Sequence, residues 1–203
     1  ATWLEFRRVL FRSPIAYINF TVDSTSYTPA TLTIPEGFSF LSNQIDSKSY
    51  NFVVLNNGVS DISVSKTGTN FIFSNIAIYE GQLISYNFTY NLASNPKQIF
   101  TLPDNNIDTT TLKVTVQPSV SNTASSVYTK VTDVVDVTAS SEVFFLQEER
   151  SGKYQIYFGN DVVGKALPDG AIVTAQYLLT NGTAANKANN FVATSARSEE
   201  HTS

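Results

Sequence analysis

The sequence contains no cysteine, no methionine, one tryptophan and one histidine among its 203 residues. Without cysteine the chain forms neither a disulfide nor a thiolate metal site, so no such cross-link supports its fold. Charged residues make up only 15% of the chain, and the net charge is -4. Sequence-independent nucleic-acid binding needs clustered lysine and arginine, and we therefore exclude DNA and RNA as partners.

Long apolar runs are also absent, and no stretch approaches the roughly 18 residues that a membrane helix requires. We expect no membrane partner. The apolar material is instead aromatic, with 14 phenylalanines and 10 tyrosines. Apolar and polar residues alternate with a period of two, and Asn, Gly, Asp and Pro interrupt this pattern about every eight to twelve residues, which is typical of antiparallel β proteins.

The alternation predicts a series of short strands and little helix. In the segment 82–90 it directs one row of side chains towards the core, namely Ile84, Tyr86, Phe88 and Tyr90. The small, polar segment 183–190 predicts a loop or a short helix. The predicted strands are residues 16–22, 30–34, 38–41, 50–55, 62–66, 71–78, 82–90, 98–101, 112–116, 127–131, 142–148, 153–158 and 172–179.

Both ends of the sequence carry a heptapeptide that one oligonucleotide explains. The codons AGA TCG GAA GAG CAC ACG TCT translate as residues 197–203, and their reverse complement translates as residues 7–13. We therefore interpret residues 1–13 as an artefact, of which residues 7–13 are translated sequencing adapter, and residues 191–203 as a truncated end followed by the same adapter. On this interpretation the natural segment contains no histidine, since the only one is His201.

A Ser/Thr/Asn-rich stretch at residues 119–126 predicts a loop and a boundary between two modules. We predict a β-sandwich-like domain at residues 14–118 and a second β module at residues 119–190. The predicted class is mainly β, with an antiparallel sandwich or partly open barrel followed by a second, smaller β module with little helix.

The second module contains a glycine-punctuated segment. The alternation at residues 154–158 predicts a strand, and Gly159 and Gly164 bracket a tight excursion after it. Residues 169–170 then predict a hairpin turn into the strand 172–179. We expect the edge of this hairpin to be able to pair with a strand of a partner.

Two stretches carry a resemblance to a known family. Residues 100–108 with 111–116, and residues 143–148 with 154–165 and 169–170, are similar to the baseplate wedge subunit of T-even-type contractile-tailed phages, within the baseplate J-like family. Many members of that family carry Asp-Gly directly after the Phe-Gly of the second stretch, where this chain has Asn160 and Asp161.

The resemblance covers most of residues 14–190 and implies a structural virion protein. It implies a place in the tail baseplate, assembly in the host bacterial cytoplasm, and contacts with copies of itself and with neighbouring wedge proteins. It implies no enzyme activity, cofactor, metal or small-molecule substrate. The motif residues that carry it, all with structural roles, are Phe100, Pro103, Ile107, Asp108, Phe145, Tyr154, Phe158, Gly159, Gly164, Gly170, Tyr177 and Gly182.

Other functions would each need particular residues in the sequence. A glycosidase would need two converging carboxylates among the acidic residues Glu148, Glu149, Asp161 and Asp169, whereas solvated turn charges are the commoner reading of such residues.

The triplet of Asp104, Asn106 and Asp108 begins like a calcium loop. Thr109 and Thr115 stand where that loop requires glycine and glutamate. A phosphate-binding loop at residues 159–164 lacks the Lys-Ser or Lys-Thr that should follow it.

One alternative function stays open beside the baseplate hypothesis. The Thr/Asn-rich strands are equally typical of an extracellular, adhesin-like β-sandwich that binds carbohydrate or another protein. An enzyme ranks third, because the sequence reveals no clustered carboxylate pocket.

Overall fold

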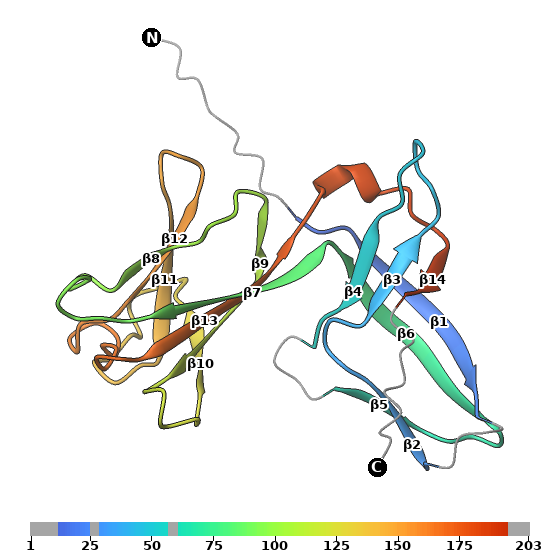
Figure 1. Cartoon of the computed structure of the whole chain (residues 1–203), viewed down its shortest axis with the longest axis horizontal. Helices are drawn as coiled ribbons and strands as arrows, with labels where there is room; N and C mark the ends of the chain where they lie inside the picture. Colours follow the sequence, from blue (N-terminus) through green and yellow to red (C-terminus); the bar gives the residue numbers. More distant parts are fainter. Residues whose placement is uncertain (1–11, 25–28, 57–60, 195–203) are drawn as a thin grey trace, which may run out of the picture. The chain divides into compact units, whose positions relative to one another are not determined.

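The computed structural model describes residues 12–24, 29–56 and 61–194 (Figure 1), and its class is mainly β, as predicted. Each of the thirteen predicted ranges overlaps an observed strand. One observed strand, β14, and the first five residues of β9 lie outside the predicted ranges. The strands are β1 (Ile15–Asp23), β2 (Thr31–Ile34), β3 (Ser39–Ser42), β4 (Asn51–Val54), β5 (Ile62–Ser65), β6 (Asn70–Glu80), β7 (Gln82–Thr89), β8 (Ile99–Thr101), β9 (Ile107–Gln117), β10 (Ser126–Lys130), β11 (Val143–Glu148), β12 (Tyr154–Phe158), β13 (Ile172–Leu179) and β14 (Phe191–Ala193); the single 3-10 helix of the described residues is η1 (Gly182–Ala185).

The chain forms two compact units that differ from the predicted domains. Unit 1 combines residues 1–83 with 180–203, and unit 2 is residues 84–179. The predicted boundary at 118–119 falls inside unit 2, because β9 and β10 pair antiparallel across the loop between them, with Val116 opposite Ser126. The polar stretch is a turn between paired strands and not a linker.

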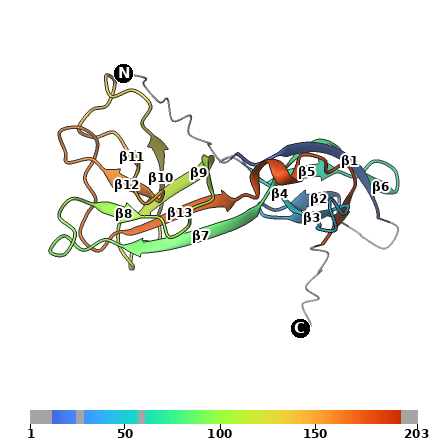
Figure 2. The same cartoon turned by 90° about the horizontal axis from the view of Figure 1, so that it is seen from above.

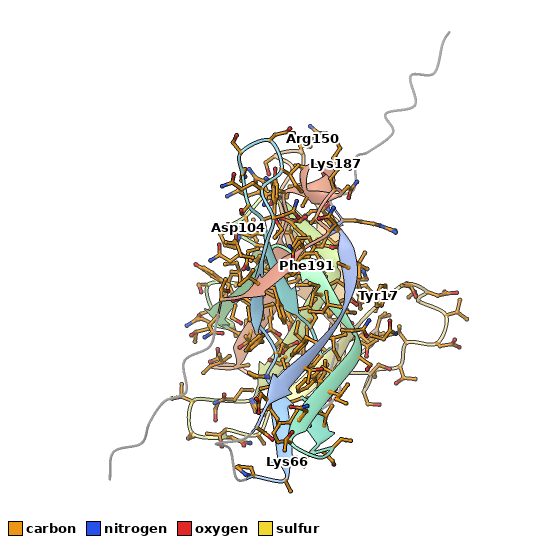
Figure 3. All side chains as sticks on the ribbon, turned by 90° about the vertical axis from the view of Figure 1, so that its right-hand side faces the viewer. Tyr17, Lys66, Asp104, Arg150, Lys187 and Phe191 are labelled. Carbon is orange, nitrogen blue, oxygen red and sulfur yellow. The ribbon has the colours of Figure 1, made fainter. Side chains whose placement is uncertain are left out.

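Unit 1 contains a five-stranded, antiparallel half-barrel in the order β1-β6-β4-β3-β14, and a two-stranded sheet of β2 and β5. Its core is aromatic. Figure 3 draws the side chains on the ribbon and labels Tyr17 of β1 and Phe191 of β14. Phe20 stacks on Phe73 at 4.8 Å between ring centroids, and Phe52 meets Phe191 edge to face at 4.9 Å. The fully or nearly buried apolar residues are Ile34, Phe40, Ile45, Tyr50, Phe52, Val54, Phe71, Phe73, Ile76, Ile78 and Ala185.

A β-bulge in β6 changes which residues point into this core. The pairing with β1 shifts its register between Ile18 and Phe20, and Asn75 adopts a positive φ of 56°. The side-chain oxygen of Asn19 accepts a hydrogen bond from the Asn75 N–H at 2.7 Å. One extra residue reverses the phase of a strand, so odd-numbered residues point inwards before the bulge and even-numbered residues after it.

The reversed phase carries Glu80, the last residue of β6, into the interior, where none of its surface is exposed. Its carboxylate accepts hydrogen bonds from the Thr180 hydroxyl at 2.6 Å, the Asn181 N–H at 3.0 Å and the Asn181 side-chain amide at 2.7 Å. A buried carboxylate is costly unless it is hydrogen-bonded. These three donors therefore fix the returning chain to β6 within unit 1.

Unit 2 is a seven-stranded, nearly closed barrel-like sheet in the order β7-β13-β9-β10-β11-β12-β8 (Figure 2). Among the pairings given for it, only β10 with β11 is parallel. Side chains link its two edge strands, since Phe88 of β7 lies 5.2 Å from Phe100 of β8 between ring centroids. The buried core is Tyr90, Phe100, Leu102, Ile107, Val114, Val116, Tyr128, Phe144, Ile156, Phe158, Leu167, Ala171, Val173, Ala175 and Tyr177.

Two finer expectations for unit 2 are wrong. Tyr86 was expected on the core face of β7 but is 42% exposed, whereas Ile84 and Phe88 do pack against the core. The expected hairpin of β12 with β13 does not form. β12 lies between β11 and β8, and β13 lies between β7 and β9, so neither strand offers a free edge.

The hydrogen bonds of Glu80 predict a large loss of stability on truncation. Glu80→Ala leaves the Thr180 and Asn181 donors without their acceptor, and we expect the free energy of unfolding of unit 1 to fall by about 3 kcal/mol. Glu80→Gln keeps the shape of the side chain and one acceptor oxygen, and we expect it to lower the free energy of unfolding by about 1 kcal/mol. Urea unfolding followed by hydrogen exchange of β6 and β14 measures both, with exposed Asp136→Ala as the control. Equal stabilities of Glu80→Ala and wild type would contradict the role given to Glu80.

Candidate functional site

The most constrained part of unit 2 is the loop between β12 and β13. A Cβ atom on Gly159 would lie 2.0 Å from the carbonyl carbon of Gly164, so the backbone passes there at a distance that only glycine permits. Gly164 has a φ of +79°, and its carbonyl accepts a hydrogen bond from the Asp161 N–H at 3.0 Å. The structure thus brings the two predicted motif glycines together, as the tight excursion required.

The polar side chains of this loop cap its own backbone. The Asn160 side-chain oxygen accepts hydrogen bonds from the N–H groups of Val162 and Val163 at 3.1 and 3.0 Å. Asp161 accepts one from the Ala166 N–H at 2.8 Å, and its own φ is 61°. A positive φ favours glycine, and Asp161 therefore occupies the conformation that glycine adopts most easily.

Gln98 holds both ends of the loop, although it is not among the predicted motif residues. Its side chain is buried, its amide donates to the Gly159 carbonyl at 3.0 Å, and its oxygen accepts from the Leu167 N–H at 2.7 Å. The backbone of Gln98 itself has a positive φ of 53°. No pattern in the sequence marks a lone glutamine before a short strand as a loop anchor.

Tyr177 and Asp104 form a second anchor, between β13 and the segment before β9. Tyr177 is fully buried, and its hydroxyl donates to the Asp104 carboxylate at 2.7 Å. Burial raises the pKa of Tyr177 well above its usual value, and the hydrogen bond to Asp104 adds to the rise. Asp108 is also buried and accepts from the Thr110 N–H and hydroxyl at 3.0 and 2.6 Å, near the start of β9.

Eleven of the twelve motif residues lie in unit 2, and Gly182 lies in unit 1. Most of the others build or border the core described above. Pro103 is exposed, and Gly170 turns the chain towards β13 with a φ of +80°. Phe145 faces outwards and stacks on Tyr157 with a centroid distance of 4.9 Å. The motif is therefore a set of packing and turn residues rather than one cluster of reactive side chains.

A shallow groove of about 350 Å³ lies beside the Phe145–Tyr157 pair. It combines an aromatic surface with an exposed amide and the side chain of a lysine. These groups suit stacking and hydrogen bonding with a planar or ring-shaped ligand. Its lining residues are Pro96, Lys97, Gln98, Phe145, Tyr157, Phe158, Gly159, Asn160 and Val163.

The acidic residues weighed as a glycosidase pair take separate partners. Asp169 accepts from the Leu92 N–H at 2.8 Å, and Glu149 accepts from the Ser151 hydroxyl at 2.9 Å. In neither of these hydrogen bonds is the partner another of the four acidic residues. Within residues 12–24, 29–56 and 61–194, no three His, Cys, Asp or Glu side chains gather as metal ligands. His201 lies outside the described residues.

One surface ion pair lies beside the motif loop. The Lys165 ammonium is 2.7 Å from the Glu142 carboxylate, and both side chains are partly exposed. This hydrogen bond lowers the pKa of Glu142 and raises that of Lys165. Exposed pairs of this kind contribute little to stability, so we assign it a local role in holding the loop against β11.

Comparisons with known protein families and with curated proteins found no match to this chain. In the part of the chain that the structure describes, no helix has the length and apolar character needed to cross a membrane.

The close approach of Gly159 and Gly164 predicts a specific sensitivity. Gly159→Ala forces the two backbone segments apart, and we expect it to reduce the free energy of unfolding of unit 2 by about 2 to 3 kcal/mol. Gly152→Ala is the control without crowding, because no atom lies within 4 Å of an added Cβ there, although Gly152 has a positive φ of 83° that Gly159 lacks. Its cost should be about 1 kcal/mol. Equal losses in urea unfolding would show that crowding is not the cause.

The raised pKa of Tyr177 predicts a loss of stability at alkaline pH. Above about pH 10 the unfolded tyrosine ionises while the folded one keeps its proton, so the free energy of unfolding falls as pH rises. Tyr177→Phe should lower stability at neutral pH by about 1 kcal/mol and make this alkaline decline less steep. Unfolding curves between pH 7 and 11 measure both effects. Exposed Tyr17→Phe is the control, and an unchanged slope in Tyr177→Phe would refute the assignment.

Proposed function

We propose that this chain is part of a baseplate wedge subunit of a contractile phage tail, and that it acts through protein-protein assembly contacts. Its partners are copies of itself and neighbouring wedge proteins. It works in the virion after assembly in the host cytoplasm. The residue resemblance described above is the basis of this proposal.

The observation that carries the proposal is the conformation of Asp161. In many members of the family a glycine follows the Phe-Gly by two residues, and Asp161 stands at that position here. Its φ of 61° is the conformation for which glycine is the usual choice. A positive φ at this position is what a glycine would favour, and it supports the proposal despite the different residue type.

The roles of the other motif residues also favour assembly. They pack the core, permit the Gly159–Gly164 approach or turn the chain, and together with the Gln98 anchor they make a rigid unit. Rigid elements suit a protein whose task is to hold neighbours at fixed positions, because little conformational entropy is lost on binding.

The groove beside Phe145 and Tyr157 favours one alternative, an adhesin-like module that binds carbohydrate. The outward-facing aromatic pair, with Asn160 and Lys97 at the same groove, supplies stacking and hydrogen-bonding groups. This alternative predicts measurable glycan binding that depends on the aromatic pair.

Co-expression separates the two functions. The full-length gene from the same source is expressed with each of its neighbouring genes, and complexes are detected by co-purification and light scattering. We expect a stable hetero-oligomer with a neighbouring tail protein. The double variant Phe145→Ala/Tyr157→Ala is the matched control, and we expect it to leave that complex intact. The adhesin function would be established instead by three results together. The chain forms no complex with the products of neighbouring genes, it binds a glycan array, and the double variant loses this binding.

A further inference from the structure

Three side chains of unit 1 bring an amine, a carboxamide and a carboxylate into one row of hydrogen bonds. Lys48 Nζ donates to Asn181 Oδ1 at 3.2 Å, and Asn181 Nδ2 donates to Glu80 Oε1 at 2.7 Å. Lys48 and Asn181 lie 133 residues apart in the sequence, and all three residues belong to unit 1. The Asn181 carboxamide is therefore held between a primary amine on one side and a carboxylate on the other.

The orientation of this carboxamide is fixed by Glu80, which has no exposed surface. Both donors of Asn181 bind the Glu80 carboxylate, the side-chain amide at Oε1 and the backbone N–H at Oε2, the latter at 3.0 Å. The Thr180 hydroxyl holds Oε2 as well, at 2.6 Å. The nitrogen of the Asn181 carboxamide thus faces Glu80, and its oxygen faces Lys48.

The lysine is positioned by its backbone and by an aromatic ring. Ile45 and Lys48 exchange two backbone hydrogen bonds, of 2.9 and 3.0 Å, across a tight turn whose central residues Asp46 and Ser47 both have positive φ. Lys48 Nζ lies 5.0 Å from the ring centroid of the buried Tyr50, within the range of a cation–π contact. The amine is therefore held from two sides, by the Tyr50 ring and by the Asn181 oxygen.

This geometry places a nucleophile close to an electrophilic carbon. The Cγ atom of Asn181 is one C=O bond from Oδ1, about 1.2 Å, so Lys48 Nζ lies no more than about 4.4 Å from Cγ. Rotation of the flexible lysine stem brings Nζ from the oxygen to the face of the carboxamide. Free amines and carboxamides react very slowly in water, but groups held in this way reach effective concentrations of up to about 10⁸ M.

We propose that Lys48 and Asn181 join in an intramolecular isopeptide bond, and that Glu80 transfers the proton in this reaction. The neutral amine attacks Cγ, and the Nζ–Cγ bond forms. In the tetrahedral intermediate both nitrogens are attached to Cγ, so the carboxylate bound at Nδ2 is also beside Nζ. Glu80 takes the proton from Nζ and gives it to Nδ2.

The reaction is balanced without any further reactant. The Cγ–Nδ2 bond breaks, and the amide nitrogen leaves as ammonia with the proton that Nζ has lost. Oxidation states do not change, and the Glu80 carboxylate is regenerated. Lys48 and Asn181 are both exposed, so the ammonia passes directly into solvent as ammonium.

The bond would join the turn before β4 to the segment that returns from unit 2. It closes a covalent loop that contains the whole of unit 2, residues 84–179. A cross-link over such a long loop restricts the unfolded chain and raises the stability of the folded one. This inference goes beyond the proposed assembly function and does not depend on it.

The first measurement is the intact mass of the purified full chain, followed by a tryptic peptide map. We expect the loss of one ammonia, about 17 Da, and a branched peptide that joins Lys48 to Asn181. Lys165 and Glu142 form an ordinary ion pair and should be recovered in separate peptides. An unchanged mass after several days of incubation would show that the proposal is wrong.

Variants identify the source of the mass loss. Asn181 precedes Gly182, and a cyclic imide formed within that backbone would also release ammonia. Lys48→Arg keeps the cation but removes the nucleophile, because the guanidinium stays protonated, and it should abolish the mass loss. Lys97→Arg, on an exposed lysine of unit 2, is the control and should retain it. Mass loss that persists in Lys48→Arg, or a gain of about 1 Da from deamidation without a branched peptide, would overturn the proposal.

Two further readouts test the role of Glu80 and the effect of the bond. Glu80→Gln keeps the shape of the side chain, and we expect it to slow the formation of the branched peptide about a hundredfold or more. We expect the Tm of Lys48→Arg to lie about 10 °C below that of the linked chain. Cross-linking of Glu80→Gln at the wild-type rate would refute the part given to Glu80 in the reaction.

Discussion

The hydrogen bonding of the buried Glu80 carboxylate is the constraint on which the construction of unit 1 depends. A carboxylate with no exposed surface requires donors, and those donors come from Thr180 and Asn181, a hundred residues further along the chain. Unit 1 is therefore completed by a segment that follows unit 2 in the sequence. The next segment benefits from the same anchor, because Gly182 donates to the Thr180 hydroxyl and η1 then places Ala185 in the core. β14 follows and adds the fifth strand to the sheet.

The local cause of this constraint is the bulge in β6. Without the extra residue at Asn75, Glu80 would share a face with outward-pointing residues such as Ile72. With it, Phe71 and Phe73 point inwards before the bulge, and Ile78 and Glu80 point inwards after it. One hydrogen bond, from Asn75 N to the Asn19 side chain, supports the conformation that produces this change. A single irregularity thus converts what would be a surface acid into the anchor of a distant segment.

The strands were predictable from the sequence because period-two alternation is a local signal, and the Gly159–Gly164 excursion was predictable because glycine spacing is local too. Strand pairing was not, since the sequence gives no sign that β9 pairs with β10 across a polar loop. The same limit hid Gln98 and Glu80. Their importance arises from partners 61 to 101 residues away, and an isolated glutamine or glutamate in a strand-like pattern has no distinguishing feature.

The edges of the main sheet are arranged differently in the two units. In unit 2 the side chains of β7 and β8 meet through Phe88 and Phe100, although these two edge strands are not hydrogen-bonded neighbours in the sheet order. The half-barrel sheet of unit 1 has five strands, and an odd number of antiparallel strands leaves its two end strands running in the same direction. Its edges therefore cannot join as an antiparallel pair, whereas the seven-stranded sheet of unit 2 includes the parallel pair of β10 and β11. The sheet of unit 1 thus stays a half-barrel, while that of unit 2 nearly closes.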